Sequence, residues 1–214
     1  VRRQRQMCIR DSLTTGSAIY FMKHVLGNGS LLGLFSMMKM FPVIIALIFT
    51  PILVKKTGSM QKVNFWGYVI SDILGIFLII FAMQKNLPMM LLFMFLKGTF
   101  AGTMSGTLNA LIAEISGYTY RTKGVHIDGM MFSCSSLGVK VGGGIGTAAV
   151  GWLLHAAGYA GKAATQTAAA TNMIFSMYIT IPVILGVVIT ILLGLMKVEK
   201  ENKRIDMERA EQAD

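Results

Sequence analysis

Five apolar stretches of membrane-spanning length set the strongest constraint on what this chain can fold into. They cover residues 31–54, 63–82, 88–113, 128–154 and 172–196. A helix needs about 20 predominantly apolar residues to cross a bilayer. Because lipid offers the backbone no hydrogen-bond partners, such segments cross it as helices. We therefore predict an all-α, multi-pass membrane protein whose first partner is the lipid bilayer.

Composition and charge support the same class. Hydrophobic residues make up 54% and charged residues 14% of the 214-residue chain, against about 45–50% and about 25% in average proteins. The net charge of +10 would also suit a nucleic-acid binder. However, the basic residues gather in short connections and at the chain ends, as in cytoplasmic membrane loops, so we expect no nucleic-acid partner. The two cysteines, Cys8 and Cys134, provide neither a disulfide framework nor a metal site.

The first residues, VRRQRQMCIRDS, are polar and basic and differ in character from the apolar residues 13–26. The chain begins with Val1 rather than methionine, and MCIRDS looks like translated sequencing-adapter sequence. We expect residues 1–12 to be non-native and the natural protein to extend further towards its N-terminus. Residues 13–26 are too short for a full span. We interpret them as the surviving end of a truncated helix.

Basic residues are distributed unevenly between alternate connections. Most of them lie in residues 55–62, residues 114–127 and the tail 197–214, and the other connections hold few. The positive-inside rule places the basic set in the cytoplasm. The C-terminus, at the end of this charged tail, is therefore predicted to be cytoplasmic.

The stretch 128–154 carries a lysine near its middle. An ammonium group in hydrocarbon costs about 2.5–3.5 kcal/mol on insertion scales, and it is tolerated where it faces a bundle interior or a watery cavity. We predict that Lys140 lines such a cavity and binds substrate; the alternative is a structural lysine that pairs with an acid. The small or polar residues on its helical face include the further site candidates Ser133, Ser136, Gly143 and Thr147. Helix 88–113, with Asn109 among its candidates, is expected to supply another wall.

Other charged residues also interrupt the apolar stretches. Asp72 and Lys97 either neutralise each other across adjacent spans or serve a cavity, as charge-pair or coupling candidates. Lys39 lies nearer the end of its span, and we expect its side chain to reach the membrane boundary. A spacing of four separates Gly142 from Gly146, which predicts a close helix–helix contact. The dinucleotide-binding interpretation of these glycines would need a preceding strand.

Three segments resemble a known group of transporters. They are YFMKHVLGN at 20–28, AEISGYTYRTKGVHIDGMMFS at 113–133 and VKVGG at 139–143. Together, in this order, they resemble the sodium- or proton-coupled sugar symporters of the glycoside–pentoside–hexuronide group, a branch of the major facilitator superfamily. Gly117, Tyr120 and His126 depart from the pattern of the group, in which the first two positions are often acidic and the third is often arginine.

The resemblance implies a fold and a function. The fold would be a major-facilitator-type C-terminal six-helix half with its first helix truncated, and its partner would be a missing N-terminal six-helix half. The chain would not be an enzyme. It would serve cation-coupled symport of a sugar or glycoside by alternating access across the plasma (inner) membrane. Co-transported Na⁺ or H⁺ would take the place of a cofactor.

The resemblance also implies roles for individual residues. The lysine that matches Lys140 is implicated in sugar transport in melibiose-permease-type transporters, and the cytoplasmic loops would act as gates. The gate residues are Lys55, Lys56, Gly58, Glu114, Arg121 and Asp128. The alternatives left open are a transporter of a non-sugar solute and a non-transporting polytopic membrane protein.

Overall fold

The computed structural model describes residues 2–161, 163, 165–195 and 198–211, and nearly all of them are helical. Five helical stretches in this part of the chain are long and apolar enough to cross a membrane, which agrees with the all-α membrane class. The helices are α1 (Arg2–His24), α2 (Leu31–Thr57), α3 (Met60–Met83), α4 (Leu87–Ala101), α5 (Thr103–Lys123), α6 (Asp128–Ala156), α7 (Ala168–Phe175), α8 (Ile181–Gly194) and α9 (Val198–Glu211), with a π-helical turn, η1 (Ser176–Thr180), between α7 and α8.

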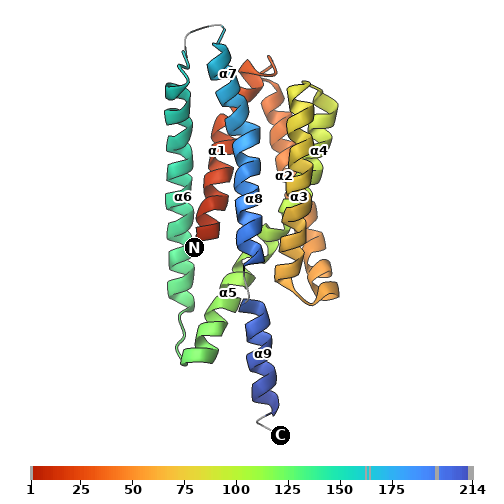
Figure 1. The fold of residues 1–214 in the computed structure, drawn as a ribbon, viewed down its shortest axis with the longest axis vertical. Helices are drawn as coiled ribbons and strands as arrows, with labels where there is room; N and C mark the ends of the chain where they lie inside the picture. The colour runs from red at the N-terminus through yellow and green to blue at the C-terminus, as the bar shows by residue number, and fades with distance from the viewer. Residues whose placement is uncertain (1, 162, 164, 196–197, 212–214) are drawn as a thin grey trace.

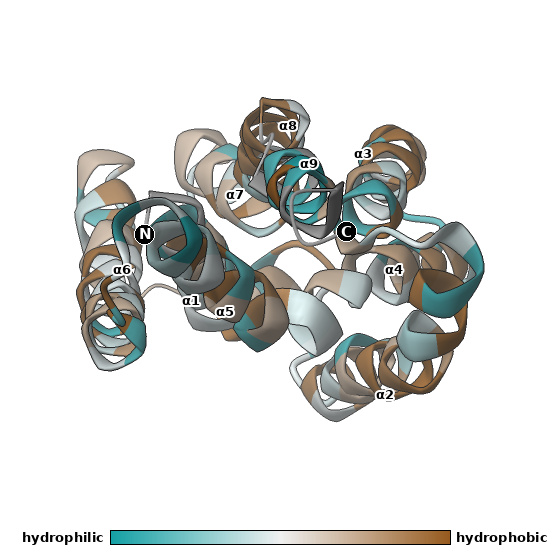
Figure 2. Ribbon diagram, turned by 90° about the horizontal axis from the view of Figure 1, so that it is seen from below, coloured by the Kyte–Doolittle hydropathy of each residue, from teal (hydrophilic) through white to brown (hydrophobic). Residues whose placement is uncertain are grey.

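The long helices form an arc rather than a closed bundle. Neighbours in contact follow the order α6, α1, α8, α3, α4 and α2, so that α6 and α2 lie at opposite ends (Figures 1 and 2). Hydrophobic residues dominate α2, α3 and α8, whereas α9 is largely hydrophilic (Figure 2). The main apolar core lies between α1, α3 and the α7–η1 segment, with Phe21, Met22 and Ile174 fully buried.

Two helices occupy the region expected to hold one span and a polar loop. The helix bends after α4, and α5 slants across to the foot of α6 (Figure 1). At the bend, a Cβ added at Gly102 would lie 2.7 Å from Cβ of Ala46, so the glycine allows α2 to approach closely. The expected loop 114–127 is helical as far as Lys123, and Gly124 ends the helix with a φ of 68°. Glycine is favoured at such left-handed ends.

The last span contains a π-helical turn. Pro182 lacks the backbone N–H that would bond to the carbonyl four residues earlier, and η1 ends two residues before it. Such turns insert one residue and often occur at functional sites. Tyr178 and Ile179 of η1 are thereby buried on the inner side of the arc.

The first helix is longer than expected. It runs from Arg2 to His24, so that residues 2–12 continue the helix of which residues 13–26 were interpreted as a surviving end. Gly142 and Gly146 of α6 lie in a close contact with it, as their spacing predicted: a Cβ at Gly146 would lie 2.8 Å from the carbonyl oxygen of Ile9. The sequence origin of residues 1–12 stays a prediction, and we assign them no functional role.

The packing of α3 against the α4–α5 bend yields a stability test. A Cβ at Gly67 would lie 2.8 Å from the carbonyl oxygen of Phe100 and 2.9 Å from Oγ1 of Thr103. We expect Gly67→Val to destabilise the fold by about 1–3 kcal/mol, the usual cost of overpacking. In α2, Gly33 has nothing within 4 Å of such an atom, so Gly33→Val should be nearly neutral. Thermal unfolding in detergent measures both, and equal midpoints would contradict the packing.

Candidate functional site

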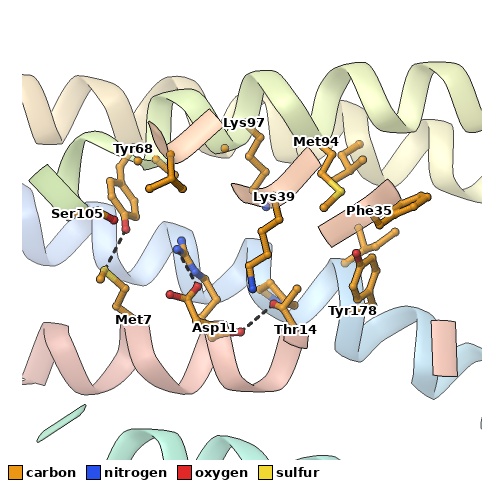
Figure 3. Close-up of a pocket in the computed structure, with 18 of the residues that line it drawn as sticks. Met7, Asp11, Thr14, Phe35, Lys39, Tyr68, Met94, Lys97, Ser105 and Tyr178 are labelled. Atoms are coloured by element: carbon orange, nitrogen blue, oxygen red, sulfur yellow. Dashed lines mark hydrogen bonds and ion pairs between the residues drawn. The ribbon is translucent and has the colours of Figure 1, made fainter. Parts of the chain in front are cut away.

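A cavity of about 180 Å³ lies on the inner side of the arc. Side chains from α1, α2, α3, α4 and η1 point into it (Figure 3). The residues that line it are Met7, Arg10, Asp11, Thr14, Phe35, Lys39, Val43, Tyr68, Leu78, Met90, Met94, Lys97, Gly98, Ala101, Gly102, Ser105, Tyr178, Ile179 and Pro182. The cavity therefore joins an apolar wall to a small number of charged and hydroxyl groups, the usual make-up of a small-molecule site.

Two lysines enter the cavity from different helices. Lys97 comes from α4, and Gly75 of α3 leaves room for it, since a Cβ there would lie 3.4 Å from its Nζ. Lys39 comes from α2, and its Nζ donates a hydrogen bond of 2.8 Å to Oγ1 of Thr15. Both ammonium groups lie within helices of membrane-spanning length. Neither forms an ion pair with the described residues.

Aromatic rings close two ends of the cavity. Phe35 is 2% exposed, and its ring centroid lies 6.5 Å from that of Tyr178. The Tyr178 ring stacks on Phe21 with centroids 4.5 Å apart, which holds it in place. At the other end lies the ring of Tyr68, which is 1% exposed. The arrangement offers ring faces for apolar contacts and ammonium groups that can donate hydrogen bonds, both of which a sugar can use.

Asp72 and Lys97 attract each other electrostatically, but they are not in ion-pair contact. Oδ2 of Asp72 accepts a hydrogen bond of 2.5 Å from Oγ1 of Thr190 in α8. The side chain is 9% exposed and faces Gly186, where an added Cβ would collide with it. In the structure, Lys97 therefore lines the cavity, whereas the carboxylate of Asp72 lies against α8.

The predicted site residues of α6 lie apart from this cavity. Ser133, Ser136 and Lys140 line a shallow groove with Phe132 and Leu137, on the face of α6 opposite to its contact with α1. Lys140 is exposed, and no hydrogen bond or ion pair joins it to the described residues. Gly143 and Thr147 continue the same face, where Oγ1 of Thr147 donates to the carbonyl oxygen of Gly143 at 3.0 Å. Asn109 of α5 is exposed and does not line the cavity.

The predicted gate residues lie at the opposite end of the structure, around α9. Nδ2 of Asn202 donates to Oε2 of Glu114 at 2.7 Å, and Arg121 forms two bonds to Asp206, at 2.7 and 3.0 Å. The carbonyl oxygen of Gly58 accepts a hydrogen bond from Nζ of Lys203. Helix α9 thus binds both α5 and the α2–α3 turn. The other gate candidates are exposed: Lys55, Lys56 and Asp128, whose carboxylate lies 3.7 Å from Nδ1 of His126.

Glu199 provides the most buried of these links. Its side chain is about one-tenth exposed, and Oε2 accepts hydrogen bonds of 2.9 Å from Oγ of Ser59 and from the backbone N–H of Gln61. Nε2 of Gln61 also donates to the carbonyl oxygen of Leu193, at 3.1 Å. The carboxylate therefore stabilises the start of α3 through charge-assisted bonds.

Sequence reasoning missed several residues of these two sites. Lys39 was expected to reach the membrane boundary, although an intramembrane ionisable residue is by default a functional candidate. Tyr178 gave no signal, since its position depends on the π turn. Glu199 and Asn202 resembled any charged tail, and only their burial distinguishes them.

Comparison with known families decides the class. A family model described as MFS/sugar transport protein matches residues 9–200. The chain belongs to this family of sugar transporters. It is therefore a multi-pass membrane protein of the major facilitator superfamily, and transport rather than catalysis is the activity of the family. The resemblance seen in the three sequence segments is confirmed at this level.

Similar proteins include two named transporters. The chain is 27% identical over 182 residues to the isoprimeverose transporter of Lactiplantibacillus pentosus. This alignment covers 85% of the chain and 37% of the transporter. The chain is 24% identical over 205 residues to the putative glycoside/cation symporter YagG of Escherichia coli, covering 93% and 44%. A third relative is an uncharacterized 29.9 kDa protein of Pseudescherichia vulneris, 26% identical over 174 residues and covering 80% and 62%.

The chain thus spans between 37% and 62% of the length of these relatives. No solved structure is detectably similar to it. Among the described residues, no group of three or more histidine, cysteine, aspartate or glutamate side chains could hold a metal ion.

The buried Glu199 carboxylate predicts a local stability effect. Glu199→Ala leaves the backbone N–H of Gln61 without its acceptor, so amide hydrogen exchange across residues 58–62 should accelerate about tenfold or more. The control is Glu208→Ala, which removes a carboxylate that pairs with Arg204 on the exposed side of α9. Exchange followed by mass spectrometry measures both variants. Unchanged exchange at 58–62 in the Glu199 variant would contradict the link.

Proposed function

We propose that this chain forms the C-terminal half of a cation-coupled sugar symporter in the plasma (inner) membrane. The observation that carries the proposal is the exposed polar face of α6, defined by Ser133, Ser136, Lys140 and Thr147. A lysine in the middle of a membrane-length helix is costly against lipid. A second six-helix half that covers this face would bring it water and hydrogen-bond partners instead.

The arc of helices supports the same arrangement. In transporters built from two repeats, substrate binds near the membrane midplane between them, and rocking of one repeat against the other gives alternating access. The cavity with Lys39 and Lys97 and the groove with Lys140 would then border one substrate pathway.

The coupling ion would be Na⁺ or H⁺. The family resemblance assigns most of the cation-binding carboxylates to the first half of such a protein. In this chain Asp72 is the coupling candidate, since its carboxylate is buried in a spanning helix and bonds to the Thr190 hydroxyl. Transport would follow the cation gradient into the cell.

Helix α9 supports a role for the cytoplasmic gate residues. It binds Glu114 and Arg121 of α5 and Gly58 of the α2–α3 turn. These links would hold the cytoplasmic ends of α2, α3 and α5 at fixed spacing while the cavity opens on the other side. Lys55, Lys56 and Asp128, which are exposed, would be free to meet the other half.

Sugar uptake tests the proposal. In the complete transporter that contains this chain, Lys140→Ala should lower uptake about tenfold or more, because a charge-assisted hydrogen bond to substrate contributes about 1.5–3 kcal/mol. The panel comprises α- and β-glycosides, pentosides and glucuronides. The matched control is Lys23→Ala, at an exposed position near the end of α1. Uptake of no member of the panel would remove the sugar assignment, and uptake unchanged by Lys140→Ala would remove the role of Lys140.

Membrane orientation is tested separately. The uneven distribution of basic residues supports a cytoplasmic position for the tail after α8. Green fluorescent protein fused after α9 should therefore fluoresce, and alkaline phosphatase fused at the same point should be inactive. Active phosphatase would reverse the proposed orientation without affecting the family assignment.

A further inference from the structure

The cavity carries a surplus of positive charge that the proposed function does not explain. Resting on that function, we propose that the transported sugar is anionic, and that Lys39 and Lys97 bind its carboxylate or phosphate group. The lining holds the cations Arg10, Lys39 and Lys97 and the single anion Asp11, which leaves a surplus of two positive charges. If residues 1–12 are left out, Lys39 and Lys97 are the only charged residues of the lining, and the surplus is again two positive charges.

Asp11 attracts both lysines and Asp72 attracts Lys97, but neither carboxylate is in ion-pair contact with either lysine. Lys39 donates to the neutral hydroxyl of Thr15, and Lys97 forms no ion pair with a described residue. The nearest carboxylate in the adjacent helix α3 is Asp72, whose Oδ2 is bonded to Thr190. Its other oxygen faces Gly186 of α8 rather than the cavity. The positive charge of the cavity is therefore available to a ligand.

The physical setting favours an anion over a neutral sugar. Charges interact several times more strongly in partly buried surroundings than in bulk water, and a buried cation without a partner is destabilising. A neutral glycoside would satisfy hydrogen bonds of both lysines but leave both charges uncompensated. A carboxylate or phosphate group compensates them through charge-assisted hydrogen bonds, which are about twice as strong as neutral ones.

The remaining lining orients the rest of the ligand. The lysines enter from α2 and α4, while Phe35 and Tyr178 form an apolar end beside them (Figure 3). A sugar with its acidic group at the lysines would place its ring or its aglycone against these aromatic faces. The cavity of about 180 Å³ would be completed by the second half of the transporter.

Matched substrates test the charge preference. Methyl β-D-glucuronide and methyl β-D-glucoside differ only in a carboxylate in place of a hydroxymethyl group, and glucose phosphate supplies the other anionic class. In vesicles that contain the complete transporter, one of the two anions should be taken up with at least about tenfold lower KM than the glucoside. Which anion is preferred identifies the acidic group.

Variants assign the preference to the two lysines. Lys39→Gln and Lys97→Gln should each raise KM for the anion about 10- to 100-fold and leave KM for the glucoside within a few-fold. Lys97→Arg, which keeps the charge, should retain the preference, and Lys23→Gln, outside the cavity, should change neither KM. Immunoblots of the membranes identify variants that fail to fold. If the glutamine variants fail to fold, the substrate preferences of the wild type and of Lys97→Arg test the proposal.

The outcomes separate this inference from the proposed function. Uptake of the glucoside with equal or better KM than both anions would overturn the anionic substrate while leaving sugar transport intact. Carboxylates of the second half that pair with both lysines would produce that result. Uptake of none of the three sugars, nor of the wider panel, would overturn the proposed function and this inference with it.

Discussion

The free-energy cost of an ammonium group in hydrocarbon governs much of this structure. Three lysines interrupt the spanning helices, and each must face protein or water rather than lipid. Lys39 and Lys97 do so within the chain, because the arc of helices brings α2 and α4 to one cavity. Lys140 has no such surroundings among the described residues. The proposed second half of the transporter would supply the surroundings that Lys140 requires.

Glycine makes the arc possible. In membranes, helices associate through close packing and not through the hydrophobic effect, since lipid is as apolar as leucine. Here Gly67 and Gly102 allow backbone atoms of α2, α3 and the α4–α5 bend to meet. Gly75 of α3 likewise leaves room for Lys97, so glycines of α3 both admit the neighbouring helix and make space for the cavity lysine.

The number of membrane-length stretches and the all-α class could be predicted from the sequence, because the apolar length of a span is a local property. Lys39 could not be placed in this way, since its position depends on how α2 lies against α1 and α4. The extension of α5 to Lys123 was missed for a related reason: its polar residues look like a loop until Asn202 and Asp206 of α9 bind Glu114 and Arg121. The position of Tyr178 depends on a π turn that no hydropathy pattern indicates.

The place of α9 in the chain has a consequence for biosynthesis. Chains fold as they are made, with earlier segments first, and Glu199 and Asn202 come after the last spanning helix. The ribosome therefore completes every helix that they join before it makes the residues that join them. During insertion the α2–α3 turn and α5 lack these bonds, and the spanning helices can still adjust to one another. Once α9 has been made, its hydrogen bonds join α5 to the α2–α3 turn and limit this adjustment.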